Sequence, residues 1–421
     1  MINNLKMMVK NSFYLYLVQG LNYLLPLLTL PFLLTTLSNE SFGIYIYALS
    51  FSQFAILLID FGFNISVTKK ITLLGQNSED EVARIYWVIT FIKFLLLIIS
   101  IIIIVMVVFL FPKLEIYRTG IFIAFVSLIG AVFFPIWWFQ GLNKMRTLSI
   151  INAFSKLLTY PFLFLFVKGN TDHNLAIFIQ SSSFLLAGLL SVIYINFNFK
   201  YYKSFSYSFF KFSTVKNEMH EAWPIFLSNS AISLYTNSLT VILGFFTSAT
   251  NVGFFGAIER VIRVICFGVY GPVNQASFPV IARLAVLEFD KAKSIFRVVF
   301  YSLFFIMCFI CIAFLIFEDF IIAKFFFQYH NVKLLLRISI FTIVPIALGG
   351  ALGQLGLLAL GTTMQKKVFS NIYIFVGLSS VPVSLFSIFY FKVEGAIFSM
   401  MLVEVVIFLL MFKYVKKYNF L

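Results

Sequence analysis

Long apolar stretches recur along the whole chain and are separated by short polar segments. About twelve of them reach the ~20 residues that an α-helix needs to cross a hydrocarbon layer ~30 Å thick. The pattern therefore predicts an all-α, polytopic membrane protein. The expected spans are 12–34, 42–63, 86–110, 119–139, 148–167, 174–195, 222–246, 253–275, 296–317, 334–359, 368–390 and 395–412.

The composition supports a chain that lies almost entirely in a bilayer. Hydrophobic residues make up 61% of the 421 positions and charged residues 11%, far less charge than the surface of a soluble protein carries. No segment between spans reaches the ~50 residues of a small folded domain. The three cysteines (Cys266, Cys308 and Cys311) lie in or beside spans, where they are expected to pack as small apolar residues.

The net charge of +15 is unevenly placed. With the N-terminus in the cytoplasm, 20 Lys and Arg residues fall in the predicted inside segments and 6 in the outside segments. Inside loops of membrane proteins carry this excess of positive charge, so both termini are expected in the cytoplasm. The basic residues thus follow from topology, and no nucleic-acid partner is predicted.

The second half of the sequence echoes the first. Gly43 and Gly253 follow similar polar segments 210 residues apart, and Pro135 and Pro345 have the same offset. An even number of spans in each half predicts two lobes of the same orientation, related by an axis along the membrane normal. The expected organisation is a six-helix lobe over 1–200, a cytoplasmic linker over 201–221 and a second six-helix lobe over 222–421.

Several ionisable residues fall inside predicted spans, where a charge is costly and usually faces a bundle interior or a wet cavity. Guanidinium and ammonium groups bind phosphate oxygens, so deep cations are candidates for binding an anionic head group. The candidate cleft cations are Lys156, Arg260 and Arg263, and the candidate coupling or helix-pairing acids are Asp60, Glu259 and Glu404.

Structural roles compete with these assignments. Glu259 can pair with Arg263 at i,i+4 spacing. Lys156 and Glu404 can form a structural ion pair between helices. Asp60 can anchor a helix end against Lys69 or Lys70. Lys93 and Arg337 lie near predicted span ends, where a long side chain is expected to snorkel to the interface. Replacing Arg263 is therefore expected to impair function more than replacing Lys93.

Polar uncharged residues within the spans offer hydrogen bonds to sugar hydroxyls, although such groups also hold helices together. The candidates are Gln19, Asn22, Asn64, Tyr235 and Asn237. The three histidines form no ligand cluster in the sequence, and no Gly-rich phosphate loop followed by Lys and Ser or Thr is present. Catalysis, a metal and a cofactor are not expected.

Three parts of the chain resemble one family. They are Leu24–Phe32 with Phe42–Tyr45 and Asp60–Ser66, then Trp137–Met145, and finally Trp223–Ser228 with Ser233–Asn237 and Val252–Phe255. These segments resemble the bacterial O-antigen and polysaccharide flippases (Wzx-type), which belong to the superfamily of the multidrug-and-toxin extruders and the lipid II flippase.

The resemblance implies twelve helices in two six-helix lobes with a V-shaped cleft, in the bacterial inner membrane. It implies a substrate that is an oligosaccharide linked to undecaprenyl pyrophosphate, moved to the periplasmic leaflet by alternating access. A gradient of H⁺ or Na⁺ would drive the cycle, and a polymerase and a chain-length regulator of the same pathway would be partners. Asp60 lies in a matching segment and is the acid that the resemblance supports.

Two other functions fit parts of the pattern. A drug/cation antiporter on the same fold would favour acidic residues in the cleft, whereas deep basic residues are more numerous here. A membrane polymerase of polysaccharides would carry a large periplasmic loop, but the longest predicted outside segment covers only 318–333. The flippase is therefore the preferred prediction.

Overall fold

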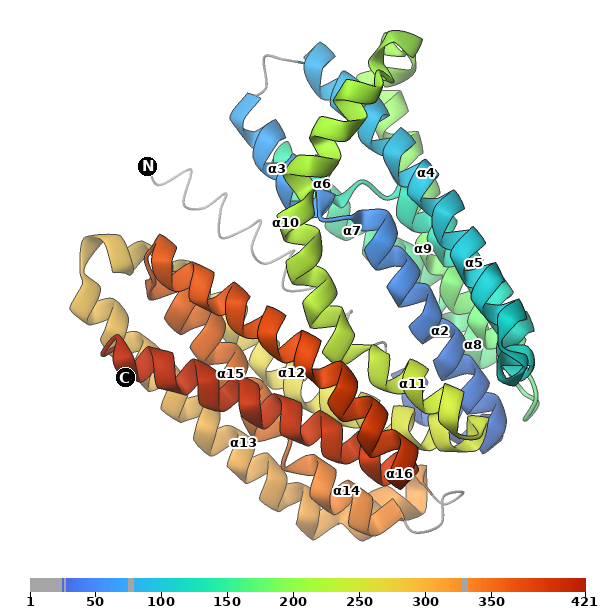
Figure 1. The fold of residues 1–421 in the computed structure, drawn as a ribbon, viewed down its shortest axis with the longest axis vertical. Coiled ribbons are helices and arrows are strands. Elements are labelled where there is room, and N and C mark those ends of the chain that lie inside the picture. Colours follow the sequence, from blue (N-terminus) through green and yellow to red (C-terminus); the bar gives the residue numbers. More distant parts are fainter. Residues whose placement is uncertain (1–24, 26–27, 75–78, 327–331) are drawn as a thin grey trace. The chain divides into compact units, whose positions relative to one another are not determined.

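The computed structural model describes residue 25 and residues 28–74, 79–326 and 332–421. Within these ranges the chain is helical and contains no β-strand (Figure 1). It divides into two compact units, the first consisting mainly of Thr36–Ser230 and the second mainly of Ala231–Leu421.

The first unit is built from long helices that are interrupted by short breaks. In chain order its elements are α2 (Asn39–Asp60), α3 (Phe63–Leu74), α4 (Glu79–Leu110), η1 (Pro112–Leu114), α5 (Glu115–Phe133), α6 (Ile136–Gly141), α7 (Met145–Thr159), α8 (Pro161–Phe166), α9 (His173–Phe199), η2 (Tyr201–Ser204) and η3 (Tyr207–Phe209). Helix α10 (Phe212–Thr236) begins in this unit and ends in the second.

The second unit contains the longest helices of the chain. Its remaining elements are α11 (Ser238–Phe246), α12 (Ala249–Leu287), α13 (Phe289–Phe325), α14 (Val332–Ile340), α15 (Ile343–Ala351), the π-helical turn η4 (Leu352–Leu360) and α16 (Thr363–Lys417). Lys392 has a φ of 48° inside α16, so this long element is two helices joined at a kink.

Membrane-spanning character is confirmed for most of these helices. In the described residues, eight helical stretches are long and apolar enough to cross a membrane. One of them, Met364–Lys417, contains the kink at Lys392. Helix α12 is more polar, because Glu259, Arg260 and Arg263 lie in its first half. The total of twelve spans and the cytoplasmic position of the termini stay predictions.

The sequence echo between the halves has a structural counterpart. Ser38 caps α2 and Ser248 caps α12, and the two serines are 210 positions apart. Each side-chain oxygen accepts a hydrogen bond from the backbone N–H three residues later, at 3.2 Å from Ser41 and 3.4 Å from Asn251. A serine at this position satisfies one of the unpaired amides at a helix start. The repeated sequence therefore starts a helix in the same way in both halves.

The aromatic motif after α5 forms part of the core of the first unit. Trp137, Trp138 and Phe139 are 1%, 0% and 0% exposed. They belong to a buried cluster that includes residues of α3 and α4. The Trp138 indole N–H donates to the Tyr201 hydroxyl at 3.4 Å. This motif therefore packs the helices of the unit together and fixes the segment that follows α9.

Helices α5 and α9 approach each other through glycine. A Cβ atom added at Gly130 would lie 2.3 Å from the backbone carbon of Phe184 and 2.4 Å from the backbone nitrogen of Leu185. Gly188 on α9 has a similar position, because its added Cβ would lie 2.8 Å from the Gly130 carbonyl oxygen. Small residues allow membrane helices to pack at this short range.

Replacing Gly130 with alanine is expected to push α5 and α9 apart and to destabilise the protein by about 1–3 kcal/mol, the usual cost of overpacking. Thermal unfolding of the purified variant in detergent measures the effect. Gly268 on α12 is the matched control, since an added Cβ there meets no atom within 4 Å. Equal melting temperatures for the two variants would show that the close approach contributes nothing to stability.

Candidate functional site

Charged and aromatic side chains from three helices meet inside the second unit. Arg263 on α12 donates from Nε to Glu259 Oε1, one helical turn earlier, at 2.8 Å. Glu404 on α16 is buried, with 7% of its surface exposed, and it interacts electrostatically with both residues. Tyr235 on α10 stacks on Tyr373 of α16 with ring centroids 6.0 Å apart. We call these five residues the Arg263 cluster.

The charges of the Arg263 cluster do not balance. Two carboxylates, Glu259 and Glu404, interact with the single guanidinium of Arg263. The pairing of Glu259 with Arg263 was one of the predicted alternatives, and it is confirmed by the 2.8 Å contact. Arg263 keeps 25% of its side-chain surface and Glu259 keeps 12%. The guanidinium is thus held in place by an acid of its own helix while part of its surface stays accessible.

A second buried ion pair lies in the first unit. Lys93 on α4 is 1% exposed, and its Nζ donates to Asp60 Oδ1 at 2.8 Å. The same ammonium donates to the carbonyl oxygen of Ala131 at 2.6 Å. Asn64 Nδ2 adds a longer contact of 3.3 Å to the other oxygen of Asp60. We call the ion pair of Lys93 and Asp60, with its contacts to Ala131 and Asn64, the Lys93 pair.

The Ala131 carbonyl needs this ammonium because of a proline. In a continuous helix the carbonyl of Ala131 would accept from the N–H of residue 135, but Pro135 has none. Helix α5 ends at Phe133, and α6 begins after Pro135. Lys93 supplies the missing donor at the negative end of α5, where a cation is favourable. The Lys93 pair therefore joins α2 and α4 to the break between α5 and α6.

These contacts correct two expectations from the sequence. Snorkelling of Lys93 is wrong, because its side chain is buried and its ammonium donates to Asp60 and to the Ala131 carbonyl. The partner of Asp60 is Lys93 and not Lys69 or Lys70, since Lys70 forms an ion pair with the buried Glu218 of α10. Lys93 is consequently no neutral control for a variant at Arg263.

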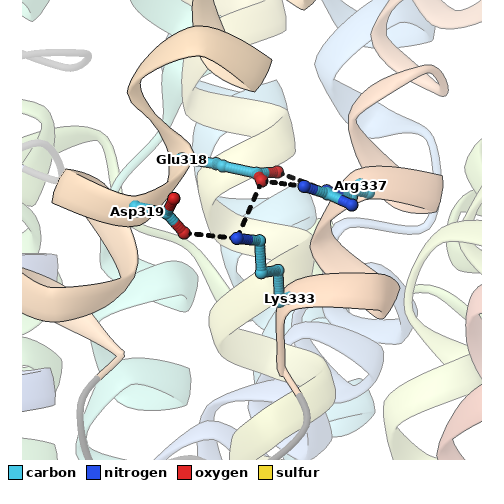
Figure 2. Close-up of polar contacts among 4 residues, drawn as sticks. All are labelled: Glu318, Asp319, Lys333 and Arg337. Carbon is cyan, nitrogen blue, oxygen red and sulfur yellow. Dashed lines mark hydrogen bonds and ion pairs between the residues drawn. The ribbon is translucent and has the colours of Figure 1, made fainter.

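Arg337, which the sequence predicts to snorkel, takes part in an ion-pair network between α13 and α14. Arg337 donates to Glu318 of α13 from two of its nitrogens, from Nε to Oε2 at 2.7 Å and from Nη2 to Oε1. Lys333 contacts Glu318 at 3.3 Å and Asp319 at 2.5 Å, as Figure 2 shows. Glu318 is buried, and its two basic partners balance its charge and join α13 to α14. We interpret this network as structural.

The other predicted site residues are dispersed over both units. Lys156 is partly buried on α7, and Arg260 is partly buried on α12, where it is the neighbour of Glu259. Asn237 lies between α10 and α11 and donates from Nδ2 to the Ser233 hydroxyl at 3.1 Å. Lys156 belongs to the first unit and Glu404 to the second, and their pairing stays a prediction. Gln19 and Asn22 lie outside the described residues.

The sequence did not predict the ion pairs of three buried residues: Lys93 was expected to snorkel, and Glu218 and Glu318 were not singled out. Each pairs with a residue from another helix, between 15 and 148 positions away in the chain. Such partners have no fixed spacing. The sequence indicates only that a charged residue within a long apolar run needs a partner, and it does not indicate which residue that partner is.

Helices that cross a membrane and enclose charged groups are typical of transporters. Residues 8–285 match the model of the family described as "Polysaccharide biosynthesis protein". This match covers more than half of the chain, and the chain belongs to the polysaccharide biosynthesis protein family. It is a multi-pass protein of the bacterial inner membrane.

Two curated relatives are both called "Putative O-antigen transporter". The one from Escherichia coli (strain K12) is 35% identical over 282 residues, which is 66% of this chain and 66% of the relative. The one from Shigella dysenteriae is 28% identical over 411 residues, which is 97% of this chain and 100% of the relative. The resemblance predicted from the sequence is confirmed by these matches.

Solved structures support the predicted fold. The lipid II flippase MurJ in an inward closed conformation has a TM-score of 0.73 at 12% identity and covers 97% of this chain and 87% of its own. An inward-facing multidrug resistance MATE family transporter of the MOP superfamily has a TM-score of 0.69 at 14% identity, covering 94% of both chains. At these identities the likeness concerns the fold, and the MATE-like fold class is confirmed.

Proposed function

We propose that this protein moves undecaprenyl-pyrophosphate-linked repeat units of O-antigen or another polysaccharide from the cytoplasmic to the periplasmic leaflet. The observation that carries the proposal is the family match over residues 8–285, together with two relatives named as O-antigen transporters. The fold shared with a lipid II flippase agrees with a lipid-linked substrate. The tail would stay in lipid while the sugar and pyrophosphate pass through the protein.

The chemistry of the described residues fits an anionic substrate. Arg263 is held by Glu259 and keeps a quarter of its side-chain surface accessible, at 25%. A guanidinium fixed in this way can bind phosphate oxygens without a large loss of side-chain freedom. Lys156 and Arg260 remain the other proposed cleft cations, and Asn64, Tyr235 and Asn237 the proposed sugar contacts.

We further propose that a gradient of H⁺ or Na⁺ drives alternating access. The proposed coupling acids within the membrane helices are Asp60, Glu259 and Glu404, and the last two interact with the same guanidinium. Because a buried charge is costly without a partner, uptake or release of a cation by such a group changes the energy of its surroundings strongly. The polymerase and the chain-length regulator of the same pathway are the proposed functional partners.

A drug/cation antiporter is the second candidate function, and one observation favours it. The Arg263 cluster has one more acid than bases, which suits a cationic substrate. The MATE-like fold fits both functions. The family match favours polysaccharide, and the experiment below separates the two.

Deletion and complementation in the source bacterium test the proposal. Surface polysaccharide and lipid-linked intermediates are measured together in the deletion strain. We expect surface glycan to disappear while complete single repeat units accumulate on the cytoplasmic side, and the intact gene to reverse both effects. Normal glycan with altered drug sensitivity would establish the antiporter. Single units that reach the outer face but are never joined would point to a polymerase.

A further inference from the structure

The segment between α9 and α10 is rich in lysine and aromatic residues and is firmly attached to the first unit. Between Lys200 and Lys216 the chain carries four lysines and no acidic residue. The Trp87 indole N–H of α4 donates to the backbone carbonyl of Tyr201 at 2.9 Å. Tyr201 itself is 3% exposed. We call this segment, Lys200–Lys216, the basic aromatic segment.

Aromatic contacts fix the depth of the basic aromatic segment along α4. Phe205 packs edge-on against Trp87 with ring centroids 5.0 Å apart. Phe210 packs against Phe91 at 4.6 Å. Phe91 lies four residues beyond Trp87, or about 6 Å further along the helix. The segment therefore follows α4 towards its apolar part and does not extend away from it.

This part of α4 is where the chain passes from polar to apolar surroundings. The helix starts with three acidic residues at Glu79, Asp80 and Glu81, and from residue 85 on its only charged residue is the buried Lys93. Tryptophan and tyrosine gather at this level in membrane proteins because their rings suit the head-group region. The basic aromatic segment thus lies at the level of the lipid head groups.

Several side chains of the segment face outward at that level. Tyr202, Tyr207 and Phe212 are 55%, 85% and 81% exposed. Lys200, Lys211 and Lys216 are exposed as well. Another positive charge lies nearby, since Lys144 Nζ is 4.9 Å from the centre of the Phe199 ring at the end of α9. Exposed rings beside exposed ammonium groups form a surface that is complementary to anionic lipid head groups.

Acidic residues around the segment only partly offset this charge. Glu218 is paired with Lys70 on α3, while Glu79 interacts electrostatically with Tyr201. Arg84 stands on the same helix as Glu79. The lysines of the segment itself have no acidic neighbour within the segment, and its outward surface is therefore basic.

We propose that the basic aromatic segment is a binding surface for anionic phospholipid, with the aromatic rings among the glycerol and upper acyl groups and the lysines at the lipid phosphates. The occupant is a phospholipid of the surrounding bilayer. The surface does not depend on the proposed transport function, because phospholipid is present whether or not a substrate is moved. It anchors the chain between α9 and α10 at the head-group level.

Native mass spectrometry of the purified full-length protein tests the proposal with phosphatidylglycerol and phosphatidylcholine as probes. We expect phosphatidylglycerol to be retained preferentially by the wild type. The triple variant Lys200→Gln, Lys211→Gln, Lys216→Gln should retain on the order of a hundredfold less of it, since each basic residue near a membrane surface contributes about 1 kcal/mol and about 1.4 kcal/mol corresponds to a factor of ten. The matched control replaces the exposed Lys113, Lys168 and Lys366 with Gln and should behave as the wild type.

A second measurement reports the position of the lipid. Brominated phosphatidylglycerol should quench tryptophan fluorescence of the wild type more than brominated phosphatidylcholine does, and Trp87→Phe should remove part of that difference. Equal retention of both lipids, or equal loss in the triple variant and the control, would overturn the proposal. Retention of a polyprenyl diphosphate without phosphatidylglycerol would overturn it too, because the surface would then serve the substrate.

Discussion

Replacement of Arg263 with alanine is expected to stop transport and to lower the stability of the protein. The change leaves Glu259 and Glu404 without the guanidinium that both interact with. Removing one partner of a buried ion pair costs about 3–5 kcal/mol. The change also removes the proposed phosphate-binding guanidinium, and we expect transport by the folded variant to fall by tenfold or more, which corresponds to about 1.4 kcal/mol or more in the barrier to transport.

A double variant separates the two roles that Arg263 can have. If the guanidinium only balances charge, Arg263→Ala combined with Glu259→Gln should restore both folding and transport. If it also binds the substrate, the double variant should recover its melting temperature but not its transport. Arg283→Ala on the same helix is the control, because Arg283 is exposed. Full transport by Arg263→Ala at matched expression would remove this residue from the site.

Replacement of Lys93 with methionine is expected to destabilise the first unit. The variant leaves the carboxylate of Asp60 without its ammonium partner and the Ala131 carbonyl without a donor. We expect a loss of about 3–5 kcal/mol in the free energy of unfolding. The measurement is thermal unfolding of the purified variant, with Lys113→Met as the exposed control.

Removing the stranded acid should reverse much of this loss. In the double variant Lys93→Met, Asp60→Asn no uncompensated charge is left in the Lys93 pair, and uncharged replacements of a buried pair are often well tolerated. The Ala131 carbonyl would still lack its donor, so recovery should be incomplete. An unchanged melting temperature of the single variant would show that the ion pair contributes nothing to stability.

The sequence alone predicts contacts that depend on local spacing. Glu259 and Arg263 are four residues apart on one helix, which brings their side chains together whatever the rest of the fold does. The same holds for Ser38 and Ser248, whose capping bonds reach only three residues ahead. The apolar runs similarly predict α4, α5 and α9, because burial in lipid requires them.

Contacts between helices could not be predicted in this way. Lys93 meets Asp60 across 33 positions, and Lys70 meets Glu218 across 148. Neither distance follows from a helical period. The burial of Lys93 was misjudged because hydropathy gives the position of a residue along a helix but not which face of the helix packs against its neighbours. Hydropathy also misses the polar turns at helix ends, such as Glu79–Ile85 of α4, which extend a helix beyond the apolar run.

The direct measurement of the central claim is transfer of lipid-linked repeat units across a bilayer by the purified protein. Repeat units extracted from the deletion strain are labelled with a fluorophore on the sugar and reconstituted with the protein in vesicles, and a membrane-impermeant reductant then destroys the accessible label. We expect loss of label well beyond the outer-leaflet fraction with the wild type, and loss of that fraction alone with Arg263→Ala or empty vesicles. Identical loss in wild-type and empty vesicles would contradict the account.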